Sequence, residues 1–209
     1  MRRWTTSALM PVAVLVALSA PQAAFAQQPT SSVDVTVKAG ILISTLTEPQ
    51  GQFQSRAQRD TGWIAGVGVA RRNGRRVAAA GELFVGTKGV QEFLGSRTVP
   101  IQYRFAFVEA TAFARVALLR SPSLSTPLFA AAGVGIATRF KTEAADGDRS
   151  VASTNGTHVD VKLGVGTEFR RVLVELRFSQ DLTAFSPVTT SLGTKHIRTV
   201  SVLLGYRIK

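Results

Sequence analysis

The chain has 209 residues, of which 45% are hydrophobic and none is cysteine. This composition excludes a disordered polyelectrolyte, a disulfide scaffold, a cysteine-based zinc site and thiol catalysis. The formal net charge of +12 is typical of nucleic-acid-binding proteins, so the position of the basic residues along the chain decides which partner they indicate.

Residues 1–26 have the three parts of a secretory signal peptide. Basic Arg2-Arg3 precedes an apolar stretch from Ala8 to Ala20, and Ala24-Phe25-Ala26 forms a cleavage site. The apolar stretch is shorter than the roughly 20 residues that a membrane-spanning helix needs. We therefore expect an exported protein whose mature domain spans residues 27–209 with a net charge of +10. Because an exported protein does not normally meet chromosomal DNA, we expect no nucleic-acid partner.

The mature chain alternates apolar residues with small or polar ones over segments of about ten residues, the length of a transmembrane β-strand. No segment shows a sustained helical period. Eight such segments are predicted as strands, at residues 33–44, 63–71, 77–85, 103–118, 128–137, 159–169, 172–179 and 198–208.

The connections between the predicted strands alternate between long and short. Long polar connections follow the first and third strands, whereas Asn73-Gly74 and Arg170-Arg171 mark tight turns. Long loops at one end and short turns at the other are typical of outer-membrane barrels. The predicted fold is therefore all-β, an eight-stranded antiparallel up-and-down transmembrane β-barrel. So few strands leave an interior filled by side chains, which disfavours a general diffusion pore.

The polar face of the predicted strands consists mainly of Gly, Ala, Ser and Thr, with a few nearly cancelling charges. An unpaired charge in a narrow lumen costs on the order of several kcal/mol, so we predict an ion-pair network rather than a wet pore. The predicted network consists of Lys38, Glu82, Glu109, Arg115, Asp160, Lys162, Glu168, Glu175 and Arg177. Glu109 with Glu175 or Glu168 could also act as an acid–base pair, but ion pairing explains the same residues without a substrate.

The excess positive charge gathers at the predicted short-turn end. The predicted periplasmic basic rim consists of Arg71, Arg72, Arg75, Arg76, Arg120, Arg170 and Arg171. Anionic phospholipid headgroups attract such a collar. The charge therefore indicates orientation in a membrane rather than a polyanionic partner.

Several short motifs resemble the small outer-membrane β-barrel domain of the PorT-like, or porin-family, type. The resembling segments are Val108 to Arg115, Ala131 to Gly135, Leu163 to Glu168, Val174 to Phe178 and Leu204 to Ile208. The resemblance implies an eight-stranded barrel in the cell outer membrane after signal-peptide cleavage. It also implies outer-membrane lipids and the barrel-assembly machinery as partners, a monomer, and no assigned activity.

Motifs for chemistry are almost absent. The Gly-Val-Gly runs at Gly66, Gly133 and Gly164 lie inside strands and lack the third glycine of a nucleotide loop, so we interpret them as relief of crowding in the lumen. His158 and His196 fall at predicted loop ends, where a surface histidine is expected rather than a ligand or base. We therefore predict no catalytic residue, no metal and no cofactor.

Aromatic residues near the predicted strand ends, Trp63, Tyr103, Phe169 and Tyr206, suggest a membrane-interface girdle. The predicted function is a structural, adhesive or ligand-contacting surface protein. Two alternatives remain open. An outer-membrane lipid-modifying enzyme would need a nucleophile beside a base, which the residues around the histidines do not offer. A soluble periplasmic calycin-like barrel would point its bulky aliphatic side chains inward instead of outward.

Overall fold

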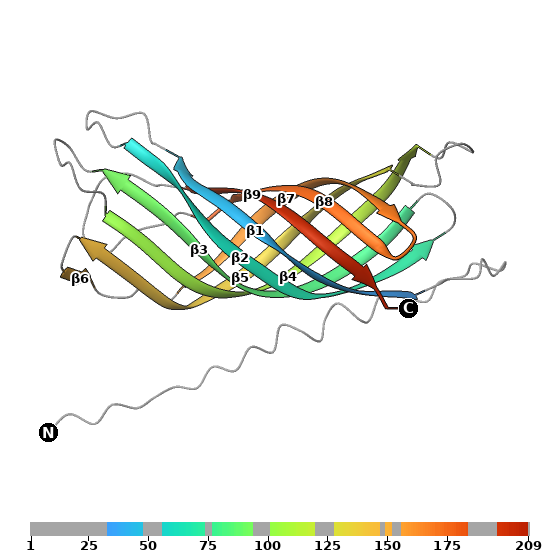
Figure 1. Cartoon of the computed structure of the whole chain (residues 1–209), viewed down its shortest axis with the longest axis horizontal. Helices are drawn as coiled ribbons and strands as arrows, with labels where there is room; N and C mark the ends of the chain where they lie inside the picture. Colours follow the sequence, from blue (N-terminus) through green and yellow to red (C-terminus); the bar gives the residue numbers. More distant parts are fainter. Residues whose placement is uncertain are drawn as a thin grey trace, which may run out of the picture.

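The computed structural model describes residues 33–47, 56–73, 77–93, 101–119, 128–146, 149–151, 156–183 and 196–208. The predicted signal peptide lies outside these residues. The strands, labelled in Figure 1, are β1 (Val33–Thr47), β2 (Arg56–Asn73), β3 (Val77–Phe93), β4 (Ile101–Leu119), β5 (Leu128–Asp146), β6 (Arg149–Val151), β7 (Gly156–Phe169), β8 (Val172–Asp181) and β9 (His196–Arg207). The described residues contain no helix of the length and apolar character that crossing a membrane requires.

The strands form a closed antiparallel barrel. The hydrogen-bonded order is β4-β3-β2-β1-β9-β8-β7-β5, and β4 pairs with β5 to complete the ring. The short β6 pairs only with the end of β5, where Ala144 faces Val151, so eight strands of the described chain close the barrel. Figure 1 shows β1 beginning and β9 ending at the same end of the barrel, with β6 at the opposite end. The predicted fold is confirmed.

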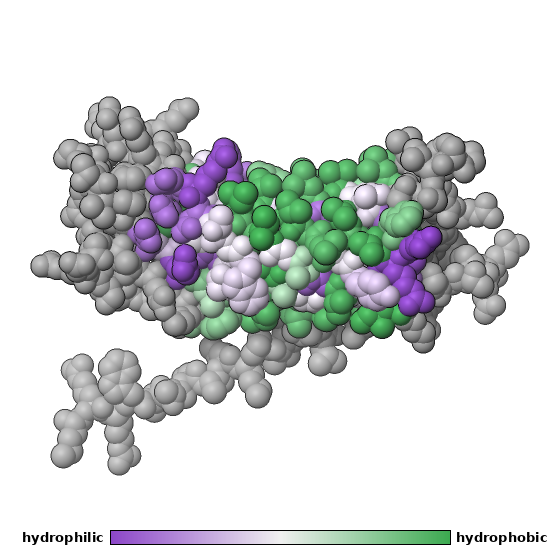
Figure 2. Space-filling model, viewed as in Figure 1, coloured by the Kyte–Doolittle hydropathy of each residue, from purple (hydrophilic) through white to green (hydrophobic). Residues whose placement is uncertain are grey.

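Alternate side chains on each strand point out of the barrel or into it. Along β9 exposed and buried residues alternate from Ile197 to Tyr206. The outward side chains are largely aliphatic, and both Leu163 and Leu204 are 60% exposed. Figure 2 shows this apolar surface as a band across the middle of the visible face, with hydrophilic residues near both ends. A soluble calycin-like barrel would bury these side chains, so that alternative is wrong.

Several strands extend beyond the segments that the sequence predicts. β2 begins at Arg56 rather than Trp63, β3 continues to Phe93, and β5 continues to Asp146. In the added part of β2, the adjacent residues Gln58 and Arg59 are both exposed. Beyond the apolar band an outward side chain faces headgroups or water, so the alternation ends while the hydrogen-bonded ladder continues.

The interior contains more large apolar side chains than the sequence predicts. Fully or nearly fully buried aromatic rings line the lumen: Phe84, Phe105, Phe107, Phe113 and Phe129. Tyr103 is also buried, because it shares the inward face of β4 with Phe105, so its place in the predicted outward girdle is wrong. Trp63, Phe169 and Tyr206 are exposed on the outside, as a girdle requires.

The glycine runs and the buried rings occupy complementary positions. Gly66 faces Phe84 across β2 and β3, and Gly133 faces Phe113 across β4 and β5. A Cβ added at Gly133 would lie 2.6 Å from Cδ1 of Phe113, closer than packed atoms allow. The absence of a side chain therefore lets each ring lie over the backbone of the neighbouring strand, which is the relief of crowding expected for these runs.

Candidate functional site

Five charged side chains form a cluster inside the barrel, which we call the central ion cluster: Lys38 of β1, Glu82 of β3, Arg115 of β4, and Glu175 and Arg177 of β8. Lys38 Nζ donates to Glu82 Oε1 at 2.5 Å and to Glu175 Oε2 at 2.8 Å. Arg177 Nη2 donates to Glu82 Oε2 at 2.8 Å and to Glu175 Oε1 at 2.7 Å. Arg115 Nη2 donates to Glu82 Oε1 at 2.6 Å.

These bonds cross the lumen. β3 and β8 are separated in the sheet by β2, β1 and β9, yet Glu82 of β3 accepts a hydrogen bond from Arg177 of β8. The side chains of Lys38, Glu82 and Glu175 are at most 1% exposed. A buried charge is tolerated when partners satisfy it, and every carboxylate oxygen in this cluster accepts from a cation. The central ion cluster therefore occupies the lumen with a bonded network.

Aromatic rings enclose the arginine of this network. The guanidinium of Arg177 lies 4.2 Å from the centroid of the Phe113 ring and 5.6 Å from that of Phe84. Contact between a guanidinium and ring faces is attractive, and more so when both are shielded from water. Both rings lie over the glycines described above, so the packing of the sheet positions the charged network.

A second group of polar side chains lies nearer than the central ion cluster to the end of the barrel at which β7 begins and β8 ends. We call it the loop-end cluster: Glu109 of β4, Arg139 of β5, His158, Asp160 and Lys162 of β7, and Asp181 of β8. Lys162 Nζ lies 2.6 Å from Asp160 Oδ2 and 3.1 Å from Glu109 Oε1. Arg139 Nη2 lies 3.3 Å from Asp181 Oδ2. All six residues are buried.

The structure places eight of the nine residues expected in the lumen network in these two clusters. Glu168 lies at the other end of β7, where its carboxylate is 2.7 Å from Arg207 and its side chain is 17% exposed. Glu109 and Glu175 belong to different clusters, and each contacts a cation.

The sequence-based prediction omitted Arg139 and Asp181 from the lumen and placed His158 at the surface. Arg139 and Asp181 lie two residues beyond the ends of the predicted strands, and continuing the inward–outward alternation that far would have placed both in the lumen. His158 is 3% exposed within β7, so its assignment to the surface is wrong. The prediction failed because the predicted strand began one residue later. His196 is only half-buried, and its Nδ1 lies 3.0 Å from the Asp181 carbonyl oxygen.

Arginines of the predicted basic rim lie at the end of the barrel where β9, the last strand, ends. Arg71 pairs with Val33 at the start of β1, Arg170 and Arg171 connect β7 to β8, and all three are exposed. Arg170 has a φ of 56°, the left-handed conformation of a tight turn between β7 and β8. The side chains of Arg72, Arg75, Arg76 and Arg120 lie outside the described residues.

The solved structures similar to this chain include three outer-membrane proteins. Ail, the attachment invasion locus protein of Yersinia pestis, is 14% identical with a TM-score of 0.44, and the match covers 84% of this chain and 99% of that one. Neisserial surface protein A is 10% identical with a TM-score of 0.49, covering 84% and 98%. The outer-membrane enzyme PagL is 14% identical with a TM-score of 0.40, covering 83% and 98%. No curated protein matches the chain significantly.

The family match is more direct than these structural likenesses. Residues 25–186 match the family described as the outer membrane protein beta-barrel domain. This span includes most of the strands, the central ion cluster and the loop-end cluster, and the match agrees with a closed barrel whose outward face is aliphatic. The chain therefore belongs to the outer membrane protein beta-barrel domain family and is a barrel of the bacterial outer membrane.

Proposed function

We propose that this protein is a monomeric, non-enzymatic outer-membrane barrel with a closed lumen, which acts as a structural, adhesive or ligand-contacting scaffold at the cell surface. The observation that carries the proposal is the bonding of Lys38 and Arg177 to both Glu82 and Glu175 across the lumen. A general diffusion pore needs a continuous water-filled channel, whereas this network and the surrounding rings occupy the interior.

The polar groups of the described residues support a non-enzymatic function over lipid modification. A lipid-modifying enzyme needs a nucleophile within hydrogen-bonding reach of a base. The hydroxyls of Ser44 and Ser201 bond to Thr199 and to the Arg177 carbonyl oxygen, respectively. Among the described hydrogen bonds, none joins either histidine to a serine hydroxyl.

The experiment that tests this proposal follows the lipids themselves. The folded full chain is reconstituted with lipopolysaccharide and phospholipids, and mass spectrometry compares the lipids before and after incubation. We expect no change in acyl-chain composition with or without added Ca²⁺. A released fatty acid or a newly acylated lipid, absent from protein-free vesicles, would overturn the non-enzymatic proposal.

The basic rim gives this scaffold an orientation. We propose that Arg71, Arg170 and Arg171 contact anionic phospholipid headgroups of the periplasmic leaflet, with the barrel-assembly machinery inserting the chain. The three exposed guanidinium groups gather at the turn-bearing end of the barrel, which supports this proposal. Attraction to an anionic surface amounts to about 1 kcal/mol per basic residue and weakens with salt.

A further inference from the structure

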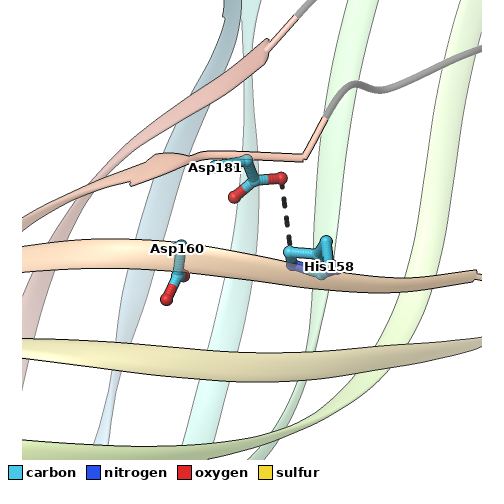
Figure 3. A group of neighbouring side chains, drawn as sticks. All are labelled: His158, Asp160 and Asp181. Carbon is cyan, nitrogen blue, oxygen red and sulfur yellow. Dashed lines mark ion pairs between the residues drawn. The ribbon is translucent and has the colours of Figure 1, made fainter.

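The loop-end cluster brings together an imidazole and two carboxylates. His158 and Asp160 are two residues apart on β7, so both point inward, and Asp181 of β8 pairs in register with Asp160. One potential ligand atom from each of these side chains lies within 4.8 Å of the other two. Figure 3 shows Asp181 directed toward His158, with Asp160 beside them on the same strand as His158. His158 Nε2 lies 3.8 Å from Asp181 Oδ2.

Four buried side-chain atoms of this group have no hydrogen-bonding partner among the described residues. Neither ring nitrogen of His158 has a hydrogen-bonding partner in the part of the chain that the structure describes, although the residue is only 3% exposed. Oδ1 of Asp160 and Oδ1 of Asp181 are also buried, and no described residue donates a hydrogen bond to either atom. Buried polar atoms in native proteins are normally satisfied by protein groups, by water or by a bound ion. These four atoms therefore indicate an occupant between the side chains.

The other oxygen of each carboxylate is already held by a cation. Asp160 Oδ2 lies 2.6 Å from Lys162 Nζ, and Asp181 Oδ2 lies 3.3 Å from Arg139 Nη2. Metal-ligating carboxylates are typically oriented in this way, with an outer partner at one oxygen and the metal at the other. Lys162 and Arg139 therefore hold the Oδ2 atoms of the two carboxylates. Neither cation competes with a metal ion for the Oδ1 atoms.

We propose that His158, Asp160 and Asp181 bind a divalent first-row transition-metal ion. Zn²⁺ is the ion that we use to represent this class. One imidazole nitrogen with two carboxylate oxygens suits Zn²⁺, Mn²⁺ or Fe²⁺ better than Ca²⁺ or Mg²⁺, which take oxygen ligands. Metal–ligand bonds of about 2.1 Å require the histidine nitrogen and the two carboxylate oxygens to move only modestly closer together. His158 is the third residue of β7 and Asp181 is the last residue of β8, so the proposed site lies close to the ends of these strands.

Lys88 of β3 makes the site sensitive to charge. Its Nζ is buried, has no hydrogen-bonding partner among the described residues and lies 5.0 Å from the centroid of the Phe107 ring. The ammonium interacts electrostatically with His158, Asp160 and Asp181. The positive charge of Lys88 stabilises the ionised carboxylates but repels a metal cation beside them. Removing it should therefore tighten metal binding, a response that adventitious binding at the surface would not show.

Metal titration of the folded full chain, prepared without a histidine tag and stripped with a chelator, tests the proposal. We expect isothermal titration calorimetry to show one Zn²⁺ per chain, and Co²⁺ to give the visible absorption of a nitrogen–oxygen site. H158Q and D181N should each weaken Zn²⁺ binding at least tenfold, whereas H196Q, which changes the chain's other histidine, should leave it unchanged. K88M should tighten binding about tenfold.

Heat-modifiable gel mobility establishes that each variant is folded, and D160N replaces any variant that is not. No saturable Zn²⁺ or Co²⁺ binding to the folded wild-type chain at millimolar concentration would overturn the proposal and leave water as the occupant. Binding that persists unchanged in folded H158Q, or that H196Q abolishes, would also overturn it. An unchanged or weaker Zn²⁺ affinity in K88M would contradict the proposed position of the ion.

Discussion

The guanidinium of Arg177 lies 4.2 Å from the centroid of the Phe113 ring, in the centre of the barrel. Phe113 lies over Gly133 of the next strand, and Arg177 bonds to Glu82 and Glu175. A glycine, a ring and an ion-pair network thus form one continuous contact across the lumen. Stability and closure of the barrel should therefore depend on the same few side chains.

Replacement of Arg177 by methionine should destabilise the barrel strongly. The change keeps the bulk near Phe113 but leaves Glu82 and Glu175 with fewer cations in a buried place. Breaking a buried ion pair costs about 3 to 5 kcal/mol. The free energy of unfolding by denaturant in lipid vesicles measures this effect. Arg198→Met, on the exposed face of β9, is the matched control and should change it by less than about 0.5 kcal/mol. Equal stability of the two variants would refute the importance of the network.

Gly133→Ala should lower stability by about 1 to 3 kcal/mol, because the added methyl group would collide with the Phe113 ring and the Ala112 carbonyl oxygen. Gly81→Ala is the control, since no atom of the described residues lies within 4 Å of a Cβ added at Gly81. The midpoint of heat-modifiable gel mobility compares the two variants. If both variants unfold at the wild-type temperature, the ring does not depend on the missing side chain.

Leu163→Arg should impair the barrel in a bilayer. Leu163 is 60% exposed near the middle of β7, and an arginine at the centre of a bilayer costs about 2 to 4 kcal/mol in a barrel. Ile208→Arg introduces the same charge just beyond the end of β9 and should cost about 1 kcal/mol or less. Unfolding free energies in vesicles distinguish them. Identical losses would mean that the apolar band does not lie in the hydrocarbon layer.

The combined change Arg71→Gln and Arg171→Gln should reduce the effect of anionic lipid on stability. We expect the free energy of unfolding of the wild-type chain to rise with the phosphatidylglycerol content of the vesicles, and the variant to lose about 1 to 2 kcal/mol of that gain. High salt should remove the difference by screening. The proposal for the rim fails if the two proteins depend equally on lipid charge at low salt.

Alternation along the chain was sufficient to predict the barrel, because an apolar exterior forces bulky aliphatic side chains onto one face of every strand. Leu163 and Leu204 illustrate this rule, since both fall on the predicted outward face and both are exposed. The charges at Lys38 and Glu82 break the apolar pattern within strands, so their inward position could also be predicted. The order of the strands followed from the lengths of the connections.

The details of the lumen could not be predicted in the same way. Inward side chains only have to fill the lumen, because they do not contact lipid. Phe107, Leu203 and Lys88 are therefore all buried there, and the inward face has no regular pattern of polarity. The ends of the strands were also uncertain, because residues beyond the apolar band lose the alternation while they stay hydrogen-bonded. His158 and Asp181 lie in these extensions, so the predicted strands left both residues out of the lumen network.

Closure of the lumen by the charged network is tested most directly by single-channel recording in planar bilayers. The folded wild-type chain, added at concentrations at which a 16-stranded porin gives clear current steps, should produce no stable unitary conductance in concentrated KCl. Reproducible open levels that increase in number with the amount of the wild-type protein would contradict a closed lumen.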